Sequence, residues 1–267
     1  MKNAFEKNTF EKRMKSMFKV DFKRLFSSPL FYIMVGISLV IPILILVMTT
    51  MMDGTVSVNP QTGKETVMEG FKNVWQIIGS ASGTEGSMSM DLTSMCNINM
   101  MFFLIAAFVC VFIADDFRSG YAKNLFTVRS KKEDYVISKI TVGFVVSTCM
   151  MVAFFIGSML GGAFAGLPFG LEGVNAGNIV FCLFSKIFLS MIFVSIYVLA
   201  SVVAKQKLWL SIVLSFGIGM LLFTIIPIVS PLNSTLLNPI LSLVGGLLFS
   251  FGFGFGSKVV LEKTSLV

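Results

Sequence analysis

Residues 208–257 contain no charged side chain over 50 consecutive positions. Uncharged apolar runs longer than about 18 residues are typical of membrane spans. A backbone in hydrocarbon must satisfy its own hydrogen bonds, so such spans are expected to be helices. The runs do not alternate between polar and apolar residues, as the strands of a membrane β-barrel would. The sequence therefore predicts an all-α membrane protein.

The apolar runs predict six transmembrane helices in a single transmembrane domain that covers residues 1–267. The longest run is divided by residues that interrupt helices, at Pro227, Pro231, Asn233 and Pro239. The expected spans are residues 29–52, 95–114, 138–165, 178–203, 208–229 and 238–257.

Lysine and arginine are concentrated on one side of this arrangement. Residues 1–28 hold eight of them and residues 114–140 hold six, and most of the rest lie in 204–207 and after 257. These segments together contain 18 of the 21 basic residues. By the positive-inside rule we expect both termini and the 115–137 loop to face the cytoplasm of a bacterial cell membrane. The net charge of +7 is then a topology signal, and no nucleic-acid partner is expected.

Several kinds of chemistry are excluded by composition. The chain has no histidine, which removes histidine-based catalysis and histidine-ligated metals. The four cysteines are far apart, and we interpret them as small apolar residues. The Gly63–Lys64 pair is followed by Glu65, so no phosphate-binding G-x-x-x-x-G-K-[ST] motif is present. We expect neither a catalytic nor a metal site, and no cofactor, in this chain.

The segment before the first span is predicted to be a basic amphipathic helix, residues 1–28. Its apolar residues recur at helical spacing with lysines and arginines between them; they are Met14, Met17, Phe18, Phe22, Leu25 and Phe26. Such a helix is expected to lie on the anionic inner leaflet. The alternative is ordinary positive charge flanking a span.

The 53–94 loop is expected to lie outside the cell. Alternation around a turn over residues 55–68 predicts a small β-hairpin. The following residues place Val67, Phe71, Val74, Trp75 and Ile78 on one helical face. This pattern predicts a short interfacial helix anchored by Trp75, and a solvated loop is the alternative.

The 114–140 segment is polar, although long uncharged runs flank it. Gly120 is a natural end for the second span. Tyr121, Leu125 and Val128 follow at helical spacing and predict a short helix. Ser130 and Glu133 form a capping-box pattern for the next helix. The acidic residues of the segment lie among basic ones, so ion pairs are the expected role for them.

This segment resembles the first cytoplasmic loop of ABC-2 type transporter permeases, including bacitracin or lantibiotic immunity and peptide-export permeases. The matching pattern is Asp115 or Asp116, then Gly120, then Lys123, Asn124 and Leu125, then Arg129 with Lys131. Tyr121 departs from the family pattern, in which a threonine or serine follows the glycine.

The resemblance implies that the short helix is a coupling helix that docks on a separate ATPase subunit. The implied coupling residues are Arg118, Gly120, Tyr121, Lys123, Asn124, Leu125, Phe126 and Arg129. ATP and magnesium would then bind to that partner. The family also implies a second permease subunit, identical or similar.

The spans carry little polar chemistry. Lys186 is expected either to extend toward the outer membrane surface or to line a cargo pathway. Overlapping G-x-x-x-G patterns at Gly157–Gly161, Gly162–Gly166 and Gly252–Gly256 predict close helix contacts, either within the subunit or between subunits.

An apolar pathway favours a hydrophobic or amphipathic cargo, such as an antimicrobial or secreted peptide or a lipophilic drug. We therefore expect the permease subunit of an ATP-driven exporter. The alternatives are a membrane anchor or sensor that does not transport, and an intramembrane enzyme.

Overall fold

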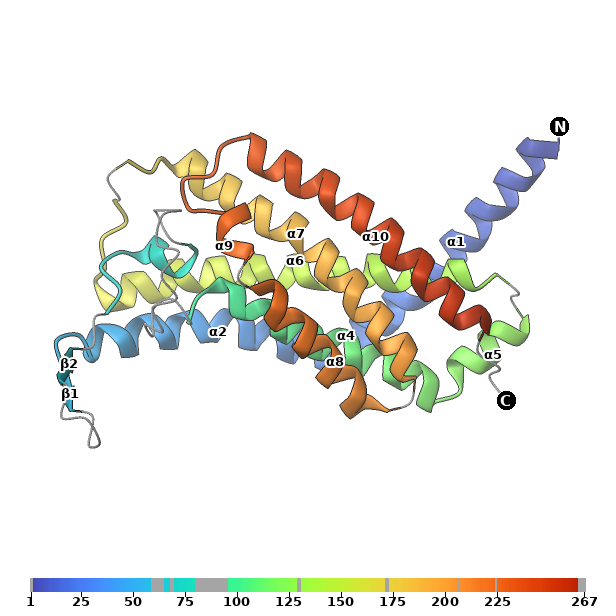
Figure 1. Cartoon of the computed structure of the whole chain (residues 1–267), viewed down its shortest axis with the longest axis horizontal. Helices are drawn as coiled ribbons and strands as arrows, with labels where there is room; N and C mark the ends of the chain where they lie inside the picture. The colour runs from blue at the N-terminus through green and yellow to red at the C-terminus, as the bar shows by residue number, and fades with distance from the viewer. Residues whose placement is uncertain are drawn as a thin grey trace.

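Long apolar helices run along the length of the molecule in the computed structural model (Figure 1). The structure describes residues 2–58, 65–67, 70–79, 96–128, 131–170, 173–205, 207–223 and 225–263. The elements are α1 (Lys2–Ser27), α2 (Pro29–Met51), β1 (Val56–Val58), β2 (Glu65–Val67), η1 (Val74–Ile77), η2 (Ile98–Met100), α4 (Met101–Arg118), α5 (Tyr121–Val128), α6 (Lys132–Ala165), α7 (Ala176–Ala204), α8 (Leu208–Phe223), α9 (Ile226–Val229) and α10 (Leu237–Lys263).

Five segments of the described chain are long and apolar enough to cross a membrane. They are α2, η2 with α4, α6, α7 and α10. The predicted span over 208–229 corresponds to α8, which has 16 residues, followed by the four-residue α9. At 1.5 Å per residue α8 is about 24 Å long, shorter than a hydrocarbon core of about 30 Å.

Two predicted boundaries differ from the structure at the polar 114–140 segment. The second span was expected to end at 114, but α4 continues to Arg118. The third span was expected to begin at 138, but α6 begins at Lys132 and extends for 34 residues. The connection between these helices is therefore shorter than the predicted 115–137 loop, and most of it is α5.

The two ends of the bundle differ in character. Both chain termini and α5 lie at one end, here called the α5 end (Figure 1). The β1–β2 hairpin lies at the other, here called the hairpin end. Val56 pairs with Val67 in antiparallel register, which confirms the predicted hairpin, although its turn at 59–64 lies outside the described residues.

Helix α2 packs along α6 through glycines, and α7 packs along α10. A methyl group on Gly157 would overlap the carbonyl oxygen of Leu39, and one on Gly161 would lie 2.7 Å from the Cα of Ile43. These glycines therefore let two backbones touch, which confirms a close contact within the subunit. By contrast, a methyl group on Gly252 would meet no atom within 4 Å.

Trp75 is packed inside the protein, so the predicted interfacial helix anchored by this residue is wrong. The helical part is only η1, and Val67 belongs to β2. The indole ring of Trp75 stacks on Phe155, with centroids 5.8 Å apart, and its Nε1 donates to the Phe169 carbonyl oxygen at 2.7 Å. A methyl group on Gly162 would overlap the side chain of Val74, so η1 sits directly against α6.

The α2–α6 contact predicts a sharp difference between two glycine-to-alanine variants. Gly157→Ala should lower stability by about 1–3 kcal/mol, because the new methyl group must push α2 away from α6. Gly36→Ala is the matched control on α2, since a methyl group there meets no atom within 4 Å. It should be neutral or slightly stabilising. Thermal unfolding in nanodiscs measures both, and equal melting temperatures would contradict the close contact.

Candidate functional site

Helix α5 is set off from α4 by a sharp turn at Gly120. This glycine has φ = 73°, in the left-handed region that glycine adopts without strain. Its amide donates to the Phe117 carbonyl at 3.4 Å and ends α4, while its own carbonyl accepts from Asn124 at 3.0 Å and starts α5. The sequence predicted both the stop and the short helix after it.

The exposed and packed sides of α5 separate the predicted coupling residues into two groups. Lys123 and Asn124 are exposed, as is Arg118 just before the turn, whereas Tyr121, Leu125 and Phe126 are half-buried. The phenyl ring of Phe126 meets Tyr135 of α6 edge to face, with centroids 5.3 Å apart. Arg129 and the predicted cap Ser130 lie outside the described residues.

Three buried charged side chains and the half-buried Arg24 meet beside α5, and they are here called the buried charge cluster: Asp21, Arg24, Asp116 and Lys139. Lys139 Nζ lies 2.8 Å from Asp21 Oδ1 and 2.8 Å from Asp116 Oδ2. Arg24 Nη2 lies 2.6 Å from Asp116 Oδ1. The two carboxylates and the two basic groups together give the cluster no net charge.

Neutral hydroxyl groups complete the cluster. Ser138 Oγ donates to Asp21 Oδ2 at 2.6 Å, and the Tyr135 hydroxyl donates to Asp116 Oδ2 at 3.0 Å. Both carboxylates are fully buried. Buried carboxylates need such partners, because their desolvation is otherwise uncompensated.

Tyr121 connects the buried charge cluster to α5. The guanidinium of Arg24 lies over the Tyr121 ring, 4.2 Å from its centroid. Burial raises the pKa of the Tyr121 hydroxyl, and the nearby carboxylates of Asp21 and Asp116 raise it further. Tyr121 therefore stays neutral, and its ring remains a partner for the cation.

A second set of ion pairs surrounds the start of α6. Arg13 Nε of α1 lies 2.9 Å from Asp134 Oδ2, and Lys258 Nζ of α10 lies 2.8 Å from Glu133 Oε2. Lys132 Nζ donates to the Leu261 carbonyl oxygen at 2.5 Å. These contacts, with those of Asp116, confirm the expected ion pairs for three of the four acidic residues of this segment; no ion pair is seen for Asp115 among the described residues.

One face of helix α1 packs against the rest of the protein. Met14, Met17, Asp21 and Leu25 are buried, and α1 packs on α6. The phenyl rings of Phe18, Phe22 and Phe26 form a separate row along the helix, with neighbouring centroids 6.2 Å apart. Part of the predicted apolar face is thus used for protein contacts.

Lys186 is buried near the hairpin end, which contradicts the first of its two predicted alternatives, extension to the outer membrane surface, and leaves the cargo pathway as a prediction. Its side chain has no exposed area. Its Nζ donates to Asn99 Oδ1 at 2.8 Å and to Ser230 Oγ at 3.2 Å. These partners come from η2 and from the residue after α9, so Lys186 joins three separate segments.

The comparisons with known proteins agree with the architecture. The profile of the family described as "ABC-2 family transporter protein" matches residues 17–222. This chain belongs to the ABC-2 transporter family. No curated protein and no solved structure matches it significantly. The chain is thus a membrane subunit of a transporter, and ABC-2 permeases generally work as dimers with an ABC ATPase.

The sequence analysis missed Asp21, although this ABC-2 permease carries a usable signal for it. Met17, Asp21 and Leu25 are four residues apart, so the carboxylate lies on the apolar face of α1. A lone carboxylate in such a stripe indicates a buried cationic partner. No local pattern reveals that this partner is Lys139, 118 residues away.

Loss of one member of the buried charge cluster should destabilise the permease strongly. Lys139→Met leaves two buried carboxylates facing Arg24 alone, and breaking a buried pair costs about 3–5 kcal/mol. Lys258→Met is the matched control, because Lys258 and Glu133 are both only half-buried, and a solvent-accessible ion pair contributes little to stability. We expect a large fall in melting temperature for Lys139→Met and little change for Lys258→Met.

A double variant tests whether charge balance is the cause. Asp21→Asn combined with Lys139→Met restores neutrality and should recover part of the stability lost in Lys139→Met. Additive losses in the two single variants would contradict a coupled cluster.

Proposed function

We propose that this chain is the permease subunit of an ATP-driven ABC exporter, with α5 as the helix that a separate ATPase subunit engages. The supporting observation is that α5 is tied to the buried charge cluster through Tyr121 while Lys123 and Asn124 face outward. A helix that must transmit force needs both a free face and a firm attachment. In this proposal the half-buried side chains of Leu125 and Phe126 pack the inner side of α5 against the rest of the protein.

The proposed topology has six crossings, with α8 and α9 together forming the fifth. Both termini and α5 then face the cytoplasm, and the hairpin faces outward, in agreement with the distribution of lysine and arginine. Helix α1 lies at the inner membrane surface with its phenylalanine row toward lipid. Phe26, which is 51% exposed, is suited to that position.

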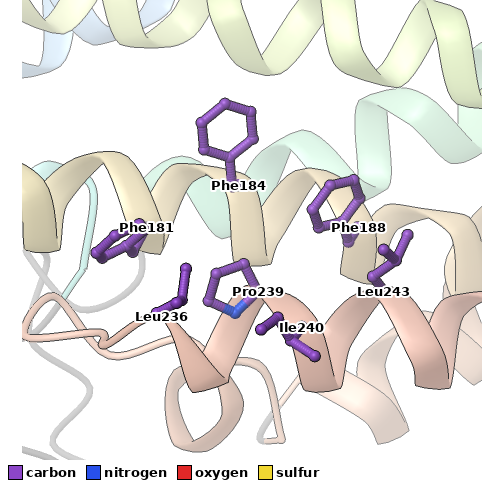
Figure 2. Close-up of a pocket in the computed structure, with 7 residues that line it drawn as sticks. All are labelled: Phe181, Phe184, Phe188, Leu236, Pro239, Ile240 and Leu243. Atoms are coloured by element: carbon purple, nitrogen blue, oxygen red, sulfur yellow. The ribbon is translucent and has the colours of Figure 1, made fainter.

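The proposed cargo is hydrophobic or amphipathic, such as a peptide or a lipophilic drug. Two cavities on the described surface support this, and both are lined by apolar side chains. One, of about 230 Å³, lies between α7 and α10 (Figure 2) and is lined by Phe181, Phe184, Phe188, Leu236, Pro239, Ile240 and Leu243. Sugars and ions need polar groups along their path, so these surfaces favour an apolar cargo.

A membrane anchor or sensor with the same partner is the second candidate. It shares the attachment of α5 and differs only in the absence of transport. The buried position of Lys186 within a span favours transport, because an anchor has no need of a buried cation there.

The coupling role of α5 predicts the effect of a charge reversal on its exposed face. In a reconstituted complex with the ATPase subunit, Lys123→Glu should lower ATPase activity stimulated by an amphipathic peptide about tenfold. Melting temperature should stay unchanged, since Lys123 makes no buried contact. Lys207→Glu, another exposed lysine at the α5 end, is the control. An equal loss in both variants would argue against a specific docking face.

The proposed orientation predicts one-sided labelling of α5. We expect Lys123→Cys, in a chain whose four native cysteines are replaced, to react with an impermeant maleimide in inverted vesicles and not in intact cells. Labelling of intact cells would place α5 outside and end the exporter proposal.

A further inference from the structure

The described chain contains two fully buried lysine side chains inside long apolar helices, and only one of them has a counter-ion. Lys139 Nζ touches two carboxylates, each at 2.8 Å. Lys186 Nζ donates to two neutral groups, Asn99 Oδ1 and Ser230 Oγ. Among the described residues, one buried lysine therefore has carboxylate partners and the other has neutral partners.

The hydrogen bonds around Lys186 leave room for one more acceptor. An ammonium group has three N–H donors, and the described residues accept two of them. Ser230 Oγ donates its own proton to the Ile226 carbonyl at 2.8 Å, so it can only accept from Lys186. A buried ammonium with neutral partners is costly, and an anionic group would offset that cost.

Ser230, which directly follows helix α9, is one of the two partners of Lys186, so a shift of α9 would change the contacts of Nζ. Helix α9 has four residues, contains Pro227, and is followed by Ser230 and Pro231. So short a helix makes few backbone hydrogen bonds within itself, and its outside contacts include the bond from Asn238 Nδ2 to the Val229 carbonyl. A small shift of α9 would remove Ser230 from Nζ and open this position.

An apolar cavity is lined by α7 residues that begin one helical turn after Lys186. It has about 200 Å³ and is lined by Leu189, Ile192, Phe193, Ile196, Leu222, Ile225, Ile226, Phe249 and Phe253. Leu189 and Phe193 lie three and seven residues after Lys186, on the same side of α7. Ile226 belongs to both sites, because its side chain lines the cavity and its carbonyl accepts from Ser230.

We propose that Lys186, with Asn99 beside it, binds the carboxylate of an amphipathic cargo whose apolar body occupies the adjacent cavity. This inference rests on the proposed export function and narrows its substrate class to amphipathic carboxylates. One ammonium balances one carboxylate. A cavity of about 200 Å³ suits a single apolar chain better than the two chains of a phospholipid.

Dodecanoate and dodecanol test the proposal, since they share an apolar chain and differ in the carboxylate. Binding to the full-length permease in phosphatidylcholine nanodiscs is measured by native mass spectrometry. The wild type should bind dodecanoate about tenfold more tightly than dodecanol. Lys186→Met should remove this preference, and Lys207→Met, at an exposed lysine, should keep it.

Asn99→Asp is a second variant that keeps the shape of the site. It places a permanent carboxylate where Asn99 Oδ1 lies, 2.8 Å from Nζ. The variant should fold as well as the wild type and lose the preference for dodecanoate, because the cation is already paired. This outcome separates anion binding from a merely structural role of Lys186.

Three results would overturn the proposal: equal binding of the two compounds by the wild type, a preserved preference in Lys186→Met or Asn99→Asp, or complete displacement of dodecanoate by phosphatidylglycerol. The last would assign the site to lipid. Failure of the export proposal is recognised separately, by an ATPase complex that no amphipathic peptide stimulates, because the binding assay needs no ATPase subunit.

Discussion

The contact of Lys139 with Asp21 and Asp116 is the interaction on which the α5 end depends. It brings together α1, α4 and α6, which are far apart in the sequence, at a point where each charge is unfavourable alone. None of the three helices can move away without leaving a buried charge unpaired. The guanidinium of Arg24, which is paired with Asp116, also lies over the Tyr121 ring and so connects α5 to the same cluster. These contacts therefore link the four helices to one another.

Helix α6 carries this constraint along the length of the molecule. Its 34 residues correspond to about 50 Å, so it reaches from α5 to the hairpin end. Along the way Gly157 and Gly161 hold it against α2, and Gly162 holds it against Val74 of η1. Contacts this close cannot slide without steric overlap. In the proposed coupling, a displacement of α5 would therefore act on α2, α6 and η1 together.

Much of this arrangement could be predicted from the sequence, because hydrophobic runs, glycines and prolines act locally. The long apolar helices, the stop at Gly120 and the hairpin register depend on residues close in sequence. The wrong prediction for Trp75 had a physical reason, because a helical apolar pattern with a tryptophan fits a membrane interface and a protein interior equally well. Only the contacts with Phe155 and Phe169, which are distant in sequence, show that Trp75 lies in the interior. The position of Lys186 likewise depends on Asn99 and Ser230, which no spacing connects to it.

The two buried lysines differ in their described partners as well as in their position. Lys139 contacts two carboxylates within the protein, so its charge needs no outside group. At Lys186 the described partners are neutral, and one of them, Ser230, belongs to the short and proline-flanked α9 region. In the proposed site, an anion that binds would stabilise whichever arrangement exposes Nζ. Ligand-dependent movement is therefore expected around α9, against the fixed pair of α2 and α6.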